Sequence, residues 1–252
     1  MQLRLDKYLA DAGLGTRSEV KKQIRTGAVR IDGVPAKSAE TKVDPEKQTV
    51  TLNGKPVTYT EYAYYILNKP AGIVSASRDK NARTVIDLIP QPRKRDLFPV
   101  GRLDKDTVGL LLITNDGKLA QSLLSPGKHV EKRYYIQYEG TLPQDAVERV
   151  EEGLDIGDET PTAPAKLIVP VVPVGDGSGL TRTVPNWNEA ELILTEGRYH
   201  QVKRMFEALG CKVAFLERKA MGKLTLPDDL KRGEVREITR EELLFQLGTV
   251  LT

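Results

Sequence analysis

The hydrophobic pattern near the start of the chain predicts two short helices. The first helix is indicated by apolar residues at helical spacing, which are Leu5, Tyr8 and Leu9. Glycines at 13 and 15 end it. Thr16 provides an N-cap for the second helix, which turns Val20 and Ile24 inward and stops at Gly27. The outward face of this second helix is basic and carries Arg17, Lys21, Lys22 and Arg25.

Short hairpins follow this helix pair. Residues 28–31 are typical of a strand that ends in the turn Asp32-Gly33, and residues 50–52 form a second hairpin with Asn53-Gly54. Helices and hairpins together predict a compact module, and residues 55–61 are predicted to be a linker. We therefore expect a first domain over residues 1–58 and a larger domain over 59–252.

The remainder of the chain mixes strand and helix patterns. Strands are predicted over 62–67, 108–114, 132–140, 167–174 and 189–195, and helices over 82–90, 116–126, 143–154 and 200–211. The uninterrupted apolar run 108–114 is typical of a buried strand, whereas 178–188 is predicted to be a long polar loop. This order of elements predicts an α+β fold with a mixed, largely antiparallel sheet.

Composition narrows the function classes. No apolar stretch approaches bilayer length and no signal-peptide pattern opens the chain, so we expect a cytoplasmic protein with no membrane partner. The single cysteine, Cys211, excludes an internal disulfide, and two histidines are too few for an ordinary structural zinc site. The chemistry is therefore expected to need no metal.

Positive charge is segregated along the chain. Residues 1–57 hold 11 Lys and Arg against 7 Asp and Glu, 69–102 hold 8 against 3, and 198–223 hold 7 against 2. Residues 139–161 are acidic, with 1 against 8. Three separate basic segments indicate a polyanionic partner, first of all a nucleic acid.

The stretch FPVGRLDKDTVGLLLITNDG, residues 98–117, places Asp104 two residues after Arg102 and just before the buried strand. Taken alone, Asp104 or Asp106 could simply organise a turn. The alternative is that Asp104 is a catalytic carboxylate, and the rest of the chain decides between these two interpretations.

Several motifs together resemble one enzyme family. The stretch RLDKYLADAGLGTRSEVKKQIRTGAVRIDG is similar to the S4-type RNA-binding domain. NKPAGIVS (68–75), GRLDKDTVGLLLITNDG (101–117) and EGRYHQVKRMF (196–206) are similar to the motifs of RNA pseudouridine synthases of the RsuA family. The match runs over nearly the whole chain, although the polar segment between Pro173 and Asn188 is longer than in a minimal member of that family.

The resemblance implies roles for individual residues. Asp104 is expected to be the catalytic carboxylate, and Lys203 the cation that keeps it ionised, with Arg204 as second candidate and substrate contact. Tyr134 is expected to stack on the uracil, with Tyr135 as the alternative ring. Val202 is expected to line the pocket, and Arg102 to fill the space left by an extruded base or to grip the RNA backbone there.

Three further residues and one helix face also receive an interpretation. Asp106 is interpreted as a local hydrogen-bonding residue, and His200 as a structural residue or an RNA contact. Lys69 is interpreted as a phosphate contact or a turn residue. The basic helix face at 17–25 is expected to bind RNA.

The resemblance also implies the substrate. We expect a monomeric, cofactor-free enzyme that acts on a uridine of 16S rRNA in a partly assembled small subunit, because Tyr199-His200 is closer to the small-subunit branch of the family. The alternatives are a 23S rRNA uridine, or a non-catalytic ribosome-assembly protein of S4 type.

Overall fold

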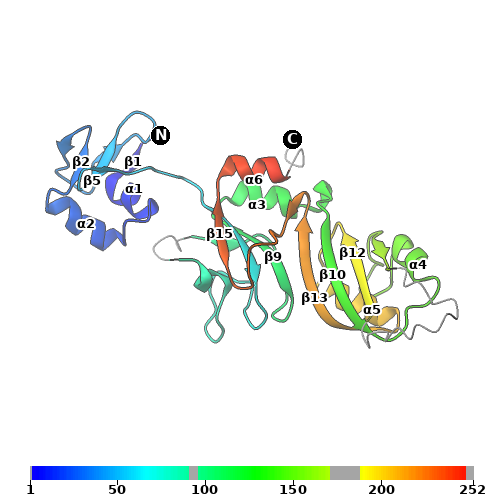
Figure 1. Cartoon of the computed structure of the whole chain (residues 1–252). Coiled ribbons are helices and arrows are strands. Elements are labelled where there is room, and N and C mark those ends of the chain that lie inside the picture. The colour runs from blue at the N-terminus through cyan, green and yellow to red at the C-terminus, as the bar shows by residue number, and fades with distance from the viewer. Residues whose placement is uncertain (1, 91–95, 171–187, 248–252) are drawn as a thin grey trace.

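A small N-terminal unit precedes a large sheet in the computed structural model, which describes residues 2–90, 96–170 and 188–247 (Figure 1). Helices α1 (Leu5–Asp11) and α2 (Arg17–Arg25) pack against each other. Within the described residues, short strands pair in the order β3-β2-β5-β6 and β1-β4. Their bounds are Leu3–Arg4 (β1), Val29–Ile31 (β2), Val34–Pro35 (β3), Lys42–Val43 (β4), Val50–Leu52 (β5) and Lys55–Pro56 (β6).

The N-terminal unit has its own core and confirms the predicted helix start. Thr16 Oγ1 accepts a hydrogen bond from the Glu19 amide at 3.3 Å, and the Glu19 carboxylate accepts one from the Thr16 amide at 2.6 Å. This reciprocal capping box satisfies two amides that the first turn of α2 leaves without helical partners. The Tyr59 ring stacks on Tyr8 at 5.1 Å, so contacts of this unit reach the residue just beyond the expected boundary at 58.

The large sheet contains nine strands in the described part of the chain. Neighbouring strands follow the spatial order β11-β12-β10-β13-β9-β7-β15, and in addition β14 pairs with β13 and β8 with β9. Its strand pairs are antiparallel except for β9 with β13, which confirms a mixed, largely antiparallel sheet. The strands are β7 (Tyr64–Lys69), β8 (Phe98–Pro99), β9 (Val108–Thr114), β10 (Lys132–Glu139), β11 (Lys166–Ile168), β12 (Asn188–Leu194), β13 (Lys212–Met221), β14 (Leu224–Thr225) and β15 (Val235–Ile238).

Strand β9 is buried on both faces, as its continuous apolar run predicts. Leu110 and Leu112 pack in one apolar cluster with α3 (Gly117–Leu124) and α6 (Arg240–Leu247), which lie together over that face (Figure 1). Leu111 and Ile113 pack in a second cluster, which includes side chains of α4 (Ala146–Glu152) and α5 (Gln201–Ala208). Alternate residues of one strand therefore join two cores.

The parallel contact between β9 and β13 requires a glycine. Gly109 has φ +101°, and a Cβ there would lie 2.3 Å from the Arg218 carbonyl oxygen. Arg218, which is buried, donates from Nε to the Leu110 carbonyl at 2.8 Å. Any side chain at position 109 would push the two strands apart, and these strands connect the two halves of the sheet.

The pattern-based reading missed the elements after residue 211, which are β13, β14, β15 and α6. In β13 the polar run Glu217-Arg218-Lys219 interrupts the apolar pattern, but neighbouring groups supply its partners, such as Arg232 on Glu217 at 2.9 Å. The position of β13 between β10 and β9 therefore depends on tertiary contacts and not on a local apolar pattern. In α6 the apolar residues do not share one face, since Leu243 is buried and Phe245 is 87% exposed.

Other predicted bounds need smaller changes. The helix expected over 82–90 is a short 3-10 turn, Val85–Leu88, and a second such turn spans Pro126–Lys128. Part of the expected linker, Lys55–Pro56, is strand β6. The predicted strand end at 171–174 falls outside the described residues, and so does the predicted polar loop over 178–188 except for Asn188, which begins β12. No described helix has the length and apolar character that a bilayer crossing requires.

Lys69, at the end of β7, is fully buried, which excludes the phosphate contact considered for it. Its Nζ donates to the carbonyl oxygens of Pro70, Asp104, Lys105 and Thr107 at 3.1, 3.0, 3.3 and 2.8 Å. Burial lowers the pKa of Lys69 to about 8, so most of the population still carries an ammonium at pH 7. The ammonium thus holds the loop over 104–107 in place through its backbone.

Replacing Lys69 with methionine should lower the free energy of unfolding by about 2–4 kcal/mol, because buried carbonyls lose their donor at a cost of roughly 1–3 kcal/mol each. Two of the four carbonyls keep a backbone donor, from Thr107 and Gly72, which limits the loss. Urea unfolding of the full chain measures this difference, and exposed Lys105→Met in the same loop is the control. If Lys69→Met matched wild type, the cost of burying the ammonium would cancel its hydrogen bonds.

Candidate active site

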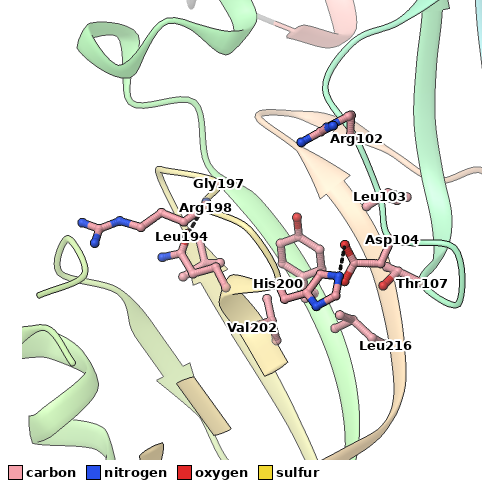
Figure 2. A pocket seen from close by; sticks show the side chains of 12 residues that line it. Arg102, Leu103, Asp104, Thr107, Leu194, Gly197, Arg198, His200, Val202 and Leu216 are labelled. Carbon is pink, nitrogen blue, oxygen red and sulfur yellow. Dashed lines mark hydrogen bonds and ion pairs between the residues drawn. The ribbon is translucent and has the colours of Figure 1, made fainter. Parts of the chain in front are cut away.

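A pocket opens where the loop after β8 meets the N-terminus of α5 (Figure 2). The loop contributes Arg102, Leu103, Asp104 and Thr107; strands contribute Tyr134, Leu194 and Leu216; the segment entering α5 contributes Gly197, Arg198, His200, Gln201 and Val202. We call this hollow the Asp104 pocket. It brings together the motifs GRLDKDTVGLLLITNDG (101–117) and EGRYHQVKRMF (196–206), and β10 adds the Tyr134 ring.

The motif NKPAGIVS (68–75) holds the backbone of the pocket loop in place. Besides the Lys69 ammonium, Gly72 donates its amide to the Lys105 carbonyl at 2.8 Å. Ser75, which is buried, donates its hydroxyl to the Leu103 carbonyl at 2.8 Å and accepts from the Leu103 amide at 3.1 Å. The residues on either side of Asp104 are therefore clamped through main-chain atoms, which fixes the direction of its side chain.

Asp104 presents a carboxylate that is 26% exposed and lies between two side chains of the third motif. Lys203 Nζ is 3.2 Å from Oδ2, and His200 Nε2 is 3.6 Å from Oδ1. Figure 2 shows the His200 ring and the carboxylate turned toward one another. The predicted pairing of Asp104 with Lys203 is thus present in the geometry.

Lys203 is shared between two carboxylates. Its ammonium donates to both oxygens of Asp106, at 2.6 and 2.8 Å, and so lies closer to Asp106 than to Asp104. Burial opposes the charge on Lys203, but the Asp106 hydrogen bond and the two negative charges raise its pKa above the ordinary value. Partial burial of Asp106 is likewise outweighed by Lys203, so the pKa of Asp106 is lowered. Lys203 therefore remains cationic throughout the neutral range.

Asp106 has a longer reach than the sequence indicated. We interpreted it as a local hydrogen-bonding residue, yet its partner Lys203 lies 97 positions away. The Asp106 side chain is 71% exposed, and it positions the ammonium from the solvent side.

The wall of the pocket is apolar and contains one aromatic ring. Tyr134 and Val202 are buried and line it, together with Leu103, Leu194 and Leu216. Tyr135, the alternative ring, instead lies against Phe215, with ring centroids 6.2 Å apart. An apolar wall with a planar ring beside a carboxylate suits a flat, neutral heterocycle.

Arg102 and Arg204 have different positions relative to the pocket. Arg102 is exposed and lines the pocket above Asp104 (Figure 2). Arg204 does not line it: its guanidinium donates to the Ile156 carbonyl at 2.6 and 3.1 Å, to the Tyr199 carbonyl at 3.0 Å, and to Asp158. This arrangement favours a role for Arg204 in holding the segment before α5 rather than the substrate contact expected from the sequence.

Sequence reasoning missed Ser75 and Arg198 and gave His200 no precise position. Arg198 lines the pocket and donates to the Thr160 and Pro161 carbonyls at 2.7 and 2.8 Å. His200 adopts a left-handed conformation, φ 47°, at the N-cap of α5. An uncommon backbone conformation cannot be predicted from residue type alone. The sequence offered only one indication that His200 lies at the site, which is its place inside the motif EGRYHQVKRMF.

The basic face of α2 lies in the N-terminal unit. Arg17, Lys22 and Arg25 are exposed, while Lys21 is half-buried with its Nζ 3.9 Å from the buried Asp6 carboxylate. Within the described residues, no carboxylate pairs with Arg17, Lys22 or Arg25, whereas Lys21 is partly compensated by Asp6.

Comparison with known proteins places both parts of the chain. Residues 63–208 match the family model described as RNA pseudouridylate synthase, and residues 3–49 match the S4 domain model. An uncharacterized RNA pseudouridine synthase of Bacillus subtilis, YtzG, is 45% identical over 96% of this chain and 97% of its own length. The ribosomal small subunit pseudouridine synthase A of Escherichia coli K12 is 36% identical over 96% and 98%.

A solved structure agrees with this placement. A crystal structure described as pseudouridylate synthase is 35% identical, covers 98% of this chain and 100% of its own, and superimposes with a TM-score of 0.63. The chain belongs to the RsuA family of RNA pseudouridine synthases, isomerases that join an S4 domain to a pseudouridine synthase domain.

Proposed function

We propose that this enzyme converts one uridine of 16S rRNA to pseudouridine in the Asp104 pocket, with Asp104 as its essential catalytic residue. The observation that carries the proposal is the half-buried Asp104 carboxylate, 3.2 Å from the Lys203 ammonium, at the edge of an apolar wall with a tyrosine ring. The names of relatives from Escherichia coli and Yersinia pestis, ribosomal small subunit pseudouridine synthase A, support the choice of 16S rRNA.

The reaction breaks the bond between ribose C1′ and uracil N1, turns the base, and forms a bond between C1′ and C5. The proton on C5 is lost and N1 gains one, so the isomerisation is balanced without an external reactant. Asp104 supports this chemistry either as a nucleophile, on the ribose or on the uracil, or as the base that removes a sugar proton. Each of these roles requires the ionised carboxylate.

Lys203 serves the reaction through that ionisation. Its charge near Asp104 offsets the loss of solvent when RNA closes over the pocket. Asp106 holds the ammonium by two short hydrogen bonds, so Lys203 is already oriented before substrate arrives.

Tyr134 and Val202 bind the detached uracil. Their buried surfaces offer an aromatic ring and an apolar contact. Because these contacts are not directional hydrogen bonds, the base can turn against the wall without breaking any. Arg102, exposed above Asp104, occupies the gap left in the RNA by the extruded nucleotide or holds the backbone there.

The division of the chain into an RNA-binding domain, 1–58, and a catalytic domain, 59–252, belongs to the same proposal. Separate apolar clusters support it, since the core around Leu5, Val20 and Val50 is distinct from the two clusters of the large sheet. We propose that the enzyme acts as a monomer in the cytoplasm on a partly assembled small subunit.

Asp104→Asn should abolish pseudouridine formation and leave RNA affinity and thermal stability close to wild type, because only the chemical step needs the carboxylate. Single-turnover assays with rRNA and pseudouridine mapping in cells with and without the gene measure this effect. Wild-type turnover by the purified variant would refute the role of Asp104. Loss of a pseudouridine from 23S rather than 16S rRNA would redirect the substrate while retaining the site.

Lys203→Met should lower the single-turnover rate far more than it lowers RNA affinity, because the Asp104 carboxylate then loses the positive charge 3.2 Å away. Single-turnover assays and binding isotherms on the same variant measure the two effects. Asp106→Asn is the matched control: it leaves Lys203 to Asp104 alone, so the rate should stay near wild type. An unchanged rate with weaker RNA binding in Lys203→Met would make Lys203 a phosphate contact instead.

Changing Arg17, Lys21, Lys22 and Arg25 together to Gln should flatten the dependence of log affinity on log salt by up to about 3 units, at roughly 0.7–0.9 per phosphate contact. The single-turnover rate at saturating enzyme should stay near wild type, because these residues lie outside the Asp104 pocket. Binding isotherms across a salt series measure the slope. An unchanged slope would show that this helix face carries no phosphate contacts.

A further inference from the structure

We propose that Tyr199 is a stacking platform for the nucleobase next to the target uridine. The inference rests on the proposed function in one respect, that the Asp104 pocket receives the target nucleotide. It assigns a second, adjacent base-binding position outside that pocket, made by a residue that no role described above includes.

The Tyr199 ring is exposed in an unusual setting. It is 71% exposed and lies face to face with the His200 ring, with centroids 3.9 Å apart and an angle of 15° between the planes. His200 in turn lines the pocket, with Nε2 3.6 Å from Asp104. The stack therefore joins His200, a residue of the pocket lining, to an exposed ring just outside that lining.

The backbone under these rings is held firmly. The Tyr199 carbonyl accepts a hydrogen bond from Arg204 at 3.0 Å, and the same guanidinium is tied to the Ile156 carbonyl at 2.6 Å. On the other side, the Arg198 amide donates to Gln201 Oε1 at 2.8 Å. His200 sits in a left-handed conformation that sets its ring beneath Tyr199. A ring fixed in advance loses little conformational entropy when a ligand stacks on it.

The chemistry of extrusion creates a partner for such a ring. When the target uridine leaves its stack, the neighbouring base loses one stacking face, which costs a few kcal/mol. Proteins that bind unstacked RNA commonly satisfy such bases with aromatic side chains. A flat ring at the pocket entrance, next to the space taken by the uridine, meets this requirement. It recognises the π face of the base and so adds affinity without adding a phosphate contact.

The test uses an rRNA fragment that contains the mapped target uridine, with 2-aminopurine placed at either flanking nucleotide. Binding to Asp104→Asn enzyme, in which chemistry is blocked, should quench one of the two probes through stacking. Adding Tyr199→Ala should restore its fluorescence and weaken binding roughly 5- to 150-fold, the range for one stacked base. The salt slope should stay unchanged, because stacking releases no counterions.

Three further variants separate stacking from other roles. Tyr199→Phe should retain quenching and affinity, whereas Tyr199→Leu, which keeps bulk but not the ring, should behave like Tyr199→Ala. Phe245→Ala removes another exposed aromatic residue, 87% exposed on α6, and should match wild type. Single-turnover rates of the Tyr199 variants in an Asp104 background at saturating enzyme measure whether the platform also assists extrusion.

The proposal is overturned if Tyr199→Ala keeps wild-type quenching and affinity, if Tyr199→Leu restores both, or if the salt slope falls as for a phosphate contact. These results are independent of the role of Asp104. If Asp104→Asn remained active while quenching still required the Tyr199 ring, the platform would stand and the catalytic assignment would fall.

Discussion

One buried ammonium organises the Asp104 pocket. Lys69 ends strand β7 inside the protein, and its donors reach the carbonyls of Asp104, Lys105 and Thr107. The chain over 104–107 makes a tight turn, in which the Thr107 amide donates to the Asp104 carbonyl, and the carbonyls of this turn face the ammonium. This tight turn directs the Asp104 carboxylate away from the core and toward the pocket. An interaction made entirely with the main chain therefore positions the side chain that is proposed to react.

The sheet carries this turn because of a second constraint, the close approach of β9 and β13. Gly109 allows it, and Arg218 ties the two strands through the Leu110 carbonyl. Strand β9 follows the Asp104 turn directly, while β13 follows helix α5, which bears Lys203. Bringing these strands together places the carboxylate and the ammonium within 3.2 Å, although they belong to motifs far apart in the chain.

Charge around Asp104 is balanced by more than one pair. Lys203 faces two carboxylates, and its stronger hydrogen bonds go to the more exposed Asp106. A cation fixed by Asp106 can stay close to Asp104 without neutralising it in a tight bidentate pair. The Asp104 carboxylate thereby keeps an accessible oxygen, which the proposed nucleophile or base requires. Arg204, the other basic residue of this helix, stabilises the segment that presents Tyr199 and His200.

The sequence by itself determined the elements with strong local signals and the family. The capped helix 17–25, the two-faced strand 108–114 and the amphipathic helix after His200 are set by periodicity, and the motifs around Asp104 and Lys203 identify the enzyme class. Tertiary structure alone decided that Lys69 is a buried anchor, that Asp106 shares Lys203, that Arg204 turns from the pocket, and that the polar run of β13 is a central strand. The physical reason is that each of these depends on partners distant in the chain, whereas residue spacing reports only which neighbours share a face.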